Sequence, residues 1–208
     1  DTPRPNIVMI LVDDMGYSDI GVMGSEIQTP HLDRLARKGV LMTHLYTTAR
    51  CCPSRASLMT GHYSHKVGMG HMDTTRSAFD SYRGTIPETV PMLPQILGAA
   101  GYQTLMVGKW HLGSQPQHWP INRGFTEFYG IPAGGGVYFW PPVGLNRPVY
   151  LNDQQVAPSE KPSWYSTDAF TDYAIEFMAE AASRKTPFFL YAAYIAPHYP
   201  LQAFKEDI

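Results

Sequence analysis

The sequence has 208 residues, of which 44% are hydrophobic and 16% are charged, as expected of an ordinary folded protein. A formal net charge of −2 and a pI near 6.5, without any basic stripe, argue against nucleic-acid binding. No apolar stretch approaches the ~20 residues that a membrane span requires. We therefore expect neither a nucleic acid nor a bilayer core among its partners.

Short apolar runs alternate with helix-like stretches along the chain. A continuous apolar run is typical of a strand buried on both faces, and a glycine just after a periodic stretch is a helix stop signal. In chain order the sequence predicts a strand at 7–12, a helix at 31–38 ended by Gly39, a strand-like run at 40–47, a helix at 54–60 ended by Gly61, a helix at 92–100 ended by Gly101, a strand at 104–107, a helix at 167–184 and a strand at 188–195.

This alternation predicts an α/β fold, with a mostly parallel or mixed sheet sandwiched by helices and joined by right-handed crossovers. Ligands of such sheets collect outside the carboxyl ends of the strands. We expect the polar residues that follow the predicted strands to meet there. These residues are Asp13, Asp14, Cys51, Lys109, His111 and His198.

The segment Cys51-Cys52-Pro53-Ser54-Arg55 combines sulfur, a helix start and a fixed cation. Pro53 suits the first helical position, so Cys51 should lie just before a helix N-terminus, where free N–H groups favour anions. Arg55 can project over the same face, so an oxyanion ester would be held there. Taken alone, Cys51 could instead be a buried structural cysteine or half of a vicinal disulfide with Cys52. Zinc is disfavoured because no C-x-x-C spacing is present.

The other candidate residues are individually ambiguous. Asp13 and Asp14 repel each other unless a cation or hydrogen-bond donors compensate them, and oxygen ligands favour calcium before magnesium. Such a pair is also common at helix N-caps and turns. Lys109 and His111 alternate along a strand end and can point the same way, although a lone Lys-x-His is usually surface. His198 stands between prolines and could be a hydrogen-bonded turn histidine.

A breaker-rich loop at 134–147 could line the mouth of a pocket. Aromatic residues in and after it could stack on a sugar or an aromatic ring, although loop aromatics more often simply pack. They are Tyr138, Phe139, Trp140 and Trp164.

The segment CCPSR at 51–55 resembles the sulfatase signature C-x-P-S-R, with Cys52 at the variable position. Other segments are similar to elements of the same family: VDDMG at 12–16, QTPHLD at 28–33, GKWHLG at 108–113 and APH at 196–198. These matches extend over nearly the whole chain. The sequence resembles the N-terminal portion of an arylsulfatase, within the alkaline phosphatase superfamily.

The resemblance implies a sulfuric ester hydrolase with an alkaline-phosphatase-like fold. In this family the first cysteine of the signature is oxidised after translation to formylglycine (3-oxoalanine). Cys51 would therefore be the precursor of the nucleophile, an aldehyde hydrate. The resemblance also implies Ca²⁺, or alternatively Mg²⁺, bound by Asp13, Asp14 and residue 51.

Roles for the remaining residues also follow from the resemblance. Arg55 would steady the aldehyde hydrate and its neighbouring charge. Lys109 would bind sulfate oxygens, and His198 would bind substrate and donate a proton toward the leaving oxygen. His111 would take a proton from the second geminal hydroxyl, so that sulfate leaves by elimination and the aldehyde returns.

The ligand count suggests an incomplete domain. Calcium takes 6 to 8 oxygens, whereas Asp13, Asp14 and a hydrated residue 51 offer at most about five. Sulfatases similar to this chain supply the remainder from a later Asp-Asn pair, together with a second lysine. We expect residues 1–208 to be the N-terminal part of a single sulfatase catalytic domain whose C-terminal remainder is absent.

Two alternatives to a sulfatase stay open at this point. One is a phosphonate monoester or phosphodiester hydrolase of the same superfamily, and the other is a non-catalytic sulfate- or glycan-binding relative in which Cys51 stays a thiol. As partners the resemblance implies a small-molecule or carbohydrate sulfate ester and, during maturation, a formylglycine-generating enzyme. The sequence lacks an N-x-Ser/Thr sequon, which favours a bacterial periplasmic or secreted protein over a lysosomal one.

Overall fold

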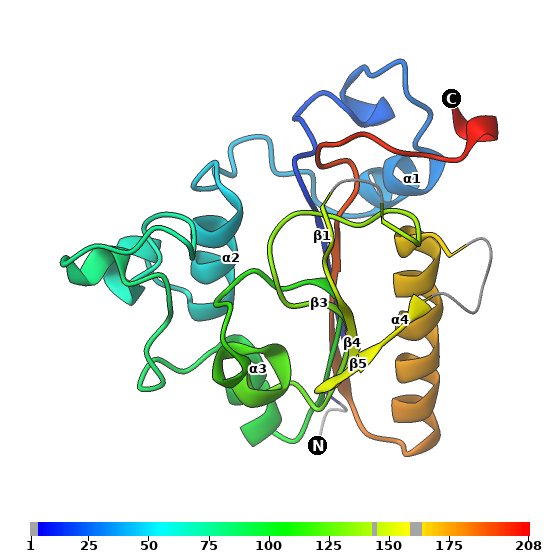
Figure 1. Cartoon of the computed structure of the whole chain (residues 1–208). Helices are drawn as coiled ribbons and strands as arrows, with labels where there is room; N and C mark the ends of the chain where they lie inside the picture. The colour runs from blue at the N-terminus through cyan, green and yellow to red at the C-terminus, as the bar shows by residue number, and fades with distance from the viewer. Residues whose placement is uncertain (1–3, 143–144, 159–163) are drawn as a thin grey trace.

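A single sheet with helices on both faces forms the centre of this computed structural model, which describes residues 4–142, 145–158 and 164–208 (Figure 1). The strands are β1 (Ile7–Val12), β2 (Gln103–Lys109), β3 (Glu127–Ile131), β4 (Val149–Leu151), β5 (Gln154–Val156) and β6 (Phe188–Tyr194). The α-helices are α1 (Pro30–Lys38), α2 (Cys51–Thr60), α3 (Leu93–Ala99) and α4 (Ser166–Ser183).

The sheet order is β1-β6-β2-β3-β4-β5. The first four strands in this order run parallel, and β4 and β5 add an antiparallel hairpin at one edge. Because parallel strands end at the same side, the last residues of β1, β6 and β2 lie close together: Val12 pairs with Tyr194, and Gly108 with Ala193. The predicted α/β class with a mixed sheet is confirmed, and this shared edge is where the candidate residues follow their strands.

Helices bury both faces of the sheet centre. On one face α4 packs through Phe170, Ala174 and Phe177 against a core that includes Leu105 and Leu190. The opposite face is covered by a second core. That core includes Ala56 and Met59 of α2, with Met106, Phe128 and Tyr191 of the sheet. Strands β2 and β6 are therefore buried on both sides, which explains their continuous apolar sequences.

Helix α2 begins earlier than predicted, at Cys51 rather than at residue 54. Its first intrahelical hydrogen bond runs from Ser54 N to Arg50 O, so Pro53 lies in the first turn, where no N–H is needed. Cys51 is thus the first residue of the helix and not the residue before it. The helix ends as predicted at Gly61, which adopts the left-handed conformation with φ of 68°.

The prediction of a strand at 40–47 is wrong. Those residues form turns and irregular structure, and all of them are exposed. Within the described parts of the chain the outer edge of β1 is free, but residues 40–47 do not pair with it, so nothing holds this run in a sheet. The sequence predictions also did not include β3, β4 and β5, of which β4 and β5 span three residues each.

Apolar side chains are exposed on β1, on α1 and on the residues that follow α1, and we call this set the apolar surface. β1 leaves Val8 and Ile10 half exposed, because Ile7, Met9 and Leu11 alternate with them and pack into the core on the α2 side, while α4 packs on β2, β3 and β6 rather than on β1. Helix α1 and the residues after it add the rest of the set: Leu32, Leu35, Val40, Leu41, Met42, Leu45 and Tyr46. In the described ranges, no helix has the length and apolar character needed to cross a membrane.

Candidate active site

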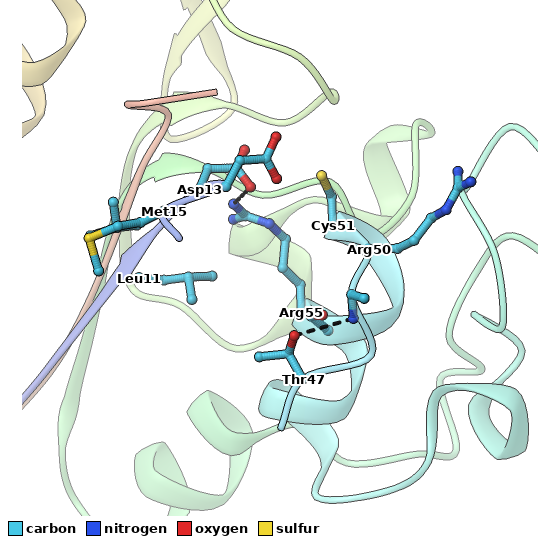
Figure 2. A pocket seen from close by; sticks show the side chains of 11 residues that line it. Leu11, Asp13, Met15, Thr47, Arg50, Cys51 and Arg55 are labelled. Atoms are coloured by element: carbon cyan, nitrogen blue, oxygen red, sulfur yellow. Dashed lines mark hydrogen bonds and ion pairs between the residues drawn. The ribbon is translucent and has the colours of Figure 1, made fainter. Parts of the chain in front are cut away.

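A pocket of about 370 Å³ lies at the carboxyl end of β1, beside the first turn of α2. Figure 2 shows the Cys51 sulfur and the Arg55 guanidinium directed toward Asp13 from the same helix. The pocket is lined by Leu11, Val12, Asp13, Asp14, Met15, Thr47, Ala49, Arg50, Cys51, Ser54 and Arg55. The Asp13 amide donates to Ala196 O over 3.2 Å, which ties the end of β1 to the loop after β6.

Asp13 is the centre of the charge arrangement. Its Oδ2 accepts a hydrogen bond from Lys109 Nζ at 2.5 Å, and its Oδ1 lies 3.3 Å from Arg55 Nη2. All three side chains are almost completely buried, with exposures of 5% for Asp13, 0% for Lys109 and 1% for Arg55. Burial acts to raise the pKa of Asp13, but the cations of Arg55 and Lys109 outweigh it and lower the pKa below the ordinary value of 3.8.

Arg55 is held beneath the pocket by several acceptors. Its Nη1 donates to the backbone carbonyl of Lys109 at 2.6 Å and to the Tyr191 hydroxyl at 3.4 Å. Burial alone would lower the pKa of Arg55, but Tyr191 and Asp13 raise it, so the guanidinium stays charged. Arg55 therefore contributes a fixed positive charge that orients Asp13.

Cys51 and Cys52 occupy different environments although they are neighbours. Both are free cysteines, so the vicinal disulfide considered from sequence is not formed. Cys51 is partly exposed in the pocket, and Lys109 Nζ lies 3.5 Å from its sulfur. Cys52 is fully buried in the core, and burial raises the pKa of its thiol to about 12. Only Cys51 presents its sulfur to the pocket.

His198 completes this group of residues. One ligand atom each of Asp13, Cys51 and His198 lie within 4.8 Å of one another. Because a carbonyl oxygen only accepts, the 2.5 Å contact to Tyr199 O requires a proton on His198 Nδ1 and leaves Nε2 on the side of Asp14, 3.6 Å from its Oδ2.

His111 lies in a second, adjacent group with Cys52 and Asp73, whose ligand atoms are also within 4.8 Å of one another. Its Nε2 is 3.3 Å from Asp73 Oδ1. Burial lowers the pKa of His111, and the cations of Lys109 and Arg55 act in the same direction against the opposing effect of Asp73. The imidazole is therefore neutral at neutral pH.

Backbone strain is concentrated around these residues. Asp14, Ala49 and His111 have positive φ angles of 66°, 55° and 59°. Non-glycine residues adopt this left-handed region at a cost, and such residues cluster at functional sites. The local fold thus holds three residues around the pocket in conformations that they would not adopt by preference.

The carboxylates fit a hard divalent cation by donor chemistry. Asp13 offers a buried ionised carboxylate and Asp14 a more exposed one, and carboxylate oxygens are the ligands that calcium and magnesium prefer. The second group offers only one carboxylate beside a buried thiol and an imidazole, so it lacks the set of oxygen ligands that calcium and magnesium prefer.

The loop at 134–147 packs beside His111, since a Cβ on Gly134 would lie only 2.1 Å from His111 Nε2. Its residues 143–144 fall outside the described ranges. The proposed aromatic stacking is not favoured for two of its members, because Tyr138 and Trp164 are buried. Tyr138 instead donates its hydroxyl proton to His198 O at 2.6 Å and fixes the loop that carries this histidine.

Sequence reasoning missed two residues that support the site, Asp73 and Tyr191. Tyr191 lies in a predicted strand, and a hydroxyl in the middle of a buried apolar run is a signal that a polar partner is needed. Asp73 lies in a segment without periodicity or a recognised motif. Its pairing with His111 depends on a loop path that local sequence does not specify.

Together these features define a charged site at the carboxyl edge of an α/β sheet, built from two acidic residues, a cysteine at a helix start and buried cations. The sulfatase family profile matches residues 5–207. The chain is 37% identical to an uncharacterized sulfatase of Schizosaccharomyces pombe, 35% to an arylsulfatase of Klebsiella aerogenes and 37% to the N-acetylgalactosamine-6-sulfatase of Mus musculus, over 97–100% of its own length. The chain belongs to the sulfatase family.

Solved structures agree with this assignment. The chain is similar to Ps i-CgsB, with 39% identity, a TM-score of 0.86 and 99% of the chain covered. It is also similar to BT4656, with 30% identity, a TM-score of 0.74 and 95% covered. The chain spans only 40–45% of the length of the three curated relatives above, and 48% and 35% of these two structures.

Proposed function

We propose that this chain carries the nucleophile and part of the metal site of a sulfuric ester hydrolase. The carrying observation is the placement of Cys51 beside the buried Asp13–Arg55–Lys109 cluster, at the carboxyl edge of the sheet. In this proposal Cys51 is converted to formylglycine, and Asp13 and Asp14 bind calcium. Family membership supports both assignments.

The divalent ion and the oxidised residue 51 would each supply one chemical function. When bound, the divalent ion would withdraw electron density from oxygens at position 51 and from the sulfate ester. The oxidised residue 51 would supply, as its hydrate, the hydroxyl that attacks sulfur. The surrounding side chains hold charge and move protons.

Three residues then act on the sulfate ester or on position 51, and a fourth, Arg55, acts through Asp13. Lys109 places its ammonium beside position 51, where negative charge increases in the transition state. Arg55 keeps the carboxylate of Asp13 ionised and oriented. His198 donates a proton to the leaving alcohol oxygen, and His111 accepts a proton from position 51 during release of sulfate.

The substrate is proposed to be a sulfated carbohydrate. Two similar structures are described as complexes with sugar ligands, Ps i-CgsB with k-i-k-neocarrahexaose and BT4656 with D-glucosamine-2-N,6-O-disulfate. An artificial aryl sulfate would be turned over at the same position, because the reacting group is the same tetrahedral oxyanion ester.

We also propose that residues 1–208 form the N-terminal part of one catalytic domain. The relatives are more than twice as long, and β1 is an edge strand whose outer side is unpaired within the described ranges. An unpaired edge flanked by exposed apolar side chains is unfavourable in water. The remaining ligands for the metal would come from the part that covers the apolar surface.

Maturation and location follow from the same proposal. Conversion of Cys51 requires a formylglycine-generating enzyme as a transient partner. We propose a periplasmic or secreted bacterial location, supported by the bacterial arylsulfatase relative and by the lack of glycosylation sequons.

The decisive experiment replaces Cys51 in the natural protein. We expect Cys51→Ser to lower aryl sulfatase activity by at least about 100-fold, because a serine hydroxyl can accept the sulfuryl group but has no geminal hydroxyl to expel it. Intact-peptide mass spectrometry over residues 48–60 should show the aldehyde in the natural protein and a covalent sulfate on the serine variant. Ser57→Ala, on the same helix but outside the signature, is the matched control and should remain active.

Three results would contradict the proposal. An unmodified thiol at Cys51 in fully active protein would exclude the formylglycine mechanism, and the same thiol in inactive protein that binds sulfated glycans would favour a binding relative. A higher rate on aryl phosphate or phosphonate esters than on aryl sulfates would favour the phosphoester hydrolase.

A further inference from the structure

Asp73, the partner of His111, has no part in the roles assigned so far. Both residues are 5% exposed, and the only polar contact of the imidazole ring within the described residues is the 3.3 Å approach of Nε2 to Asp73 Oδ1. His111 Nδ1 is buried and lacks a hydrogen-bond partner in the same ranges. Burying a nitrogen without a hydrogen-bond partner costs free energy, and a catalytic role is one explanation for such an atom.

The chemistry of the carboxylate fixes the tautomer. An ionised carboxylate only accepts hydrogen bonds, so the nitrogen that faces Asp73 must carry the proton. Because the imidazole is neutral, its other nitrogen then holds a free lone pair. Nδ1 is therefore the basic atom of His111.

Several contacts hold Asp73 in place. The backbone amide of Thr74 hydrogen-bonds its carboxylate, and the hydrogen bond of His111 is the largest influence that lowers its pKa. The Asp73 carboxylate also lies within 4.8 Å of the Cys52 sulfur and of the His111 ring nitrogen. Position 52 follows the proposed nucleophile directly in α2, so this carboxylate lies beside the first turn of that helix.

The ring of His111 is confined from the other side. A Cβ at position 134 would lie 2.1 to 2.6 Å from three atoms of the imidazole, so glycine is needed there for the ring to fit. The backbone of His111 is also fixed, by its positive φ and by a 3.0 Å hydrogen bond from its amide to Pro132 O. The ring therefore has little room to rotate. The hydrogen bond to Asp73 keeps the proton on Nε2.

We infer that Asp73 is a positioning residue for His111, holding the ring with Nε2 protonated and Nδ1 ready to accept a proton from position 51. This inference rests on the proposed function, because the proton transfer has meaning only in that reaction. In this step the free hydroxyl at position 51 loses its proton to Nδ1 and its oxygen forms the aldehyde C=O bond, while the bond from the same carbon to the ester oxygen breaks and sulfate leaves with that electron pair. The resulting imidazolium is stabilised by Asp73.

The test uses the mature natural protein and the variant Asp73→Asn, which keeps the size and one acceptor but removes the charge. We expect kcat to fall roughly 10- to 100-fold with KM changed less than about threefold, since the lost interaction acts on a chemical step. Nitrogen-15 NMR of labelled histidines reads the ring directly, and His111→Gln identifies its signals. The natural protein should show a protonated Nε2 and an unprotonated Nδ1, and the variant should show a changed pattern.

The matched control is Asp80→Asn, because that side chain is 93% exposed and contacts only Arg83 among the described residues. It should leave both the kinetics and the NMR signals unchanged. An Nδ1-protonated ring in the natural protein, or unchanged kcat in a folded Asp73→Asn variant, would overturn the inference. So would a stoichiometric transition metal bound by Cys52, Asp73 and His111.

The two proposals fail separately. If the natural protein hydrolyses no sulfate ester, the proposed function is wrong, while the NMR pattern still shows whether Asp73 sets the tautomer. If Asp73→Asn does not fold, the nitrogen spectrum of the natural protein alone decides the positioning role. If Asp73 has a merely structural role, Asp73→Asn should lower the free energy of unfolding, but its kcat should equal that of the Asp80→Asn control.

Discussion

At the scale of single residues, Asp13 determines the electrostatic balance of the site. One carboxylate faces two buried cations, Lys109 and Arg55, so the cluster carries a net positive charge when Asp13 is ionised. Buried charges that lose their partner are strongly destabilising. The same residue is therefore needed for the stability of the fold and for the proposed metal site.

We expect stability to depend on pH through Asp13. Its pKa in the folded state is below the ordinary value of 3.8, so its contribution is fully present above about pH 5 and is lost as the pH falls below 3.8 through the folded value. Asp13→Asn should lower the free energy of unfolding at neutral pH by about 3 kcal/mol or more and flatten the decline in acid. Urea unfolding between acidic and neutral pH, with a chelator present, measures both effects.

Asp80→Asn is the control for this experiment, because its carboxylate is exposed. A variant at position 13 as stable as the natural protein would mean that the ion pairs contribute little. Asp73 also has a lowered pKa, so some acid sensitivity should remain in the Asp13 variant.

At the scale of elements, α2 links the pocket to the core. Its first residue, Cys51, faces the pocket, while Cys52, Ala56 and Met59 are buried against the sheet. The helix stops at Gly61, whose left-handed conformation suits glycine best. Correct placement of the proposed nucleophile thus depends on both ends of a short helix.

Two exposed glycines give a matched test of this helix end. A Cβ at Gly61 or at Gly98 would meet no atom within 4 Å, so only backbone conformation separates them. Gly61→Ala should destabilise the protein by about 1 kcal/mol because φ is positive, whereas Gly98→Ala, in α3, should stabilise it by up to about 1 kcal/mol. Thermal unfolding of the two variants checks the opposite signs, and equal effects would contradict the explanation.

The sequence predicted the elements whose local pattern is strong. The strands at 7–12, 104–107 and 188–195 and the helices ended by Gly39, Gly61 and Gly101 are present, with no end shifted by more than three residues. The prediction of a strand at 40–47 was wrong because an apolar run can also be an exposed segment that another part of a protein covers. β3 was missed because it is short and carries Glu127 and Gly130 in an otherwise apolar run.

The site was predicted unevenly for the same physical reason. Motif resemblance identified Cys51, Asp13 and Lys109, which the structure brings together. Asp13 and Lys109 lie at strand ends as expected, whereas Cys51 begins α2 and follows no strand. The role of Asp73 required knowledge of how a loop folds back onto β2. Local sequence also could not show that Arg55 is sealed from solvent, because burial depends on Tyr191 and the rest of the sheet.

At the scale of the whole molecule, the apolar surface is the feature that the described residues leave without a partner. Its members include side chains as exposed as Val40 at 83% and Leu45 at 73%. Single exposed hydrophobic residues are normal, but a succession of them beside a free strand edge indicates a surface for another polypeptide segment. This agrees with the proposal that residues 1–208 are one part of a larger domain.

The double variant Val40→Ser/Leu45→Ser tests this proposal in two proteins. In the isolated 1–208 chain it should reduce binding of a hydrophobic dye and self-association, because exposed apolar area is removed. In the protein from the complete reading frame it should lower the free energy of unfolding by roughly 2 kcal/mol or more, since the same side chains would be buried there. No loss of stability in the longer protein would mean that another partner, or none, covers this surface.

The position of β1 at the edge of the sheet has a consequence for the proposed metal site. The carboxylates proposed to bind the ion follow a strand that is paired on one side only within the described ranges, so thermal motion of that strand changes the positions of these carboxylates directly. The calcium affinity should therefore depend on how far the domain has folded. Calcium would bind weakly while the outer edge of β1 is unpaired and tightly once another segment covers that edge. If the chain is part of a sulfatase catalytic domain as proposed, activity would then appear only after folding of the whole domain is complete.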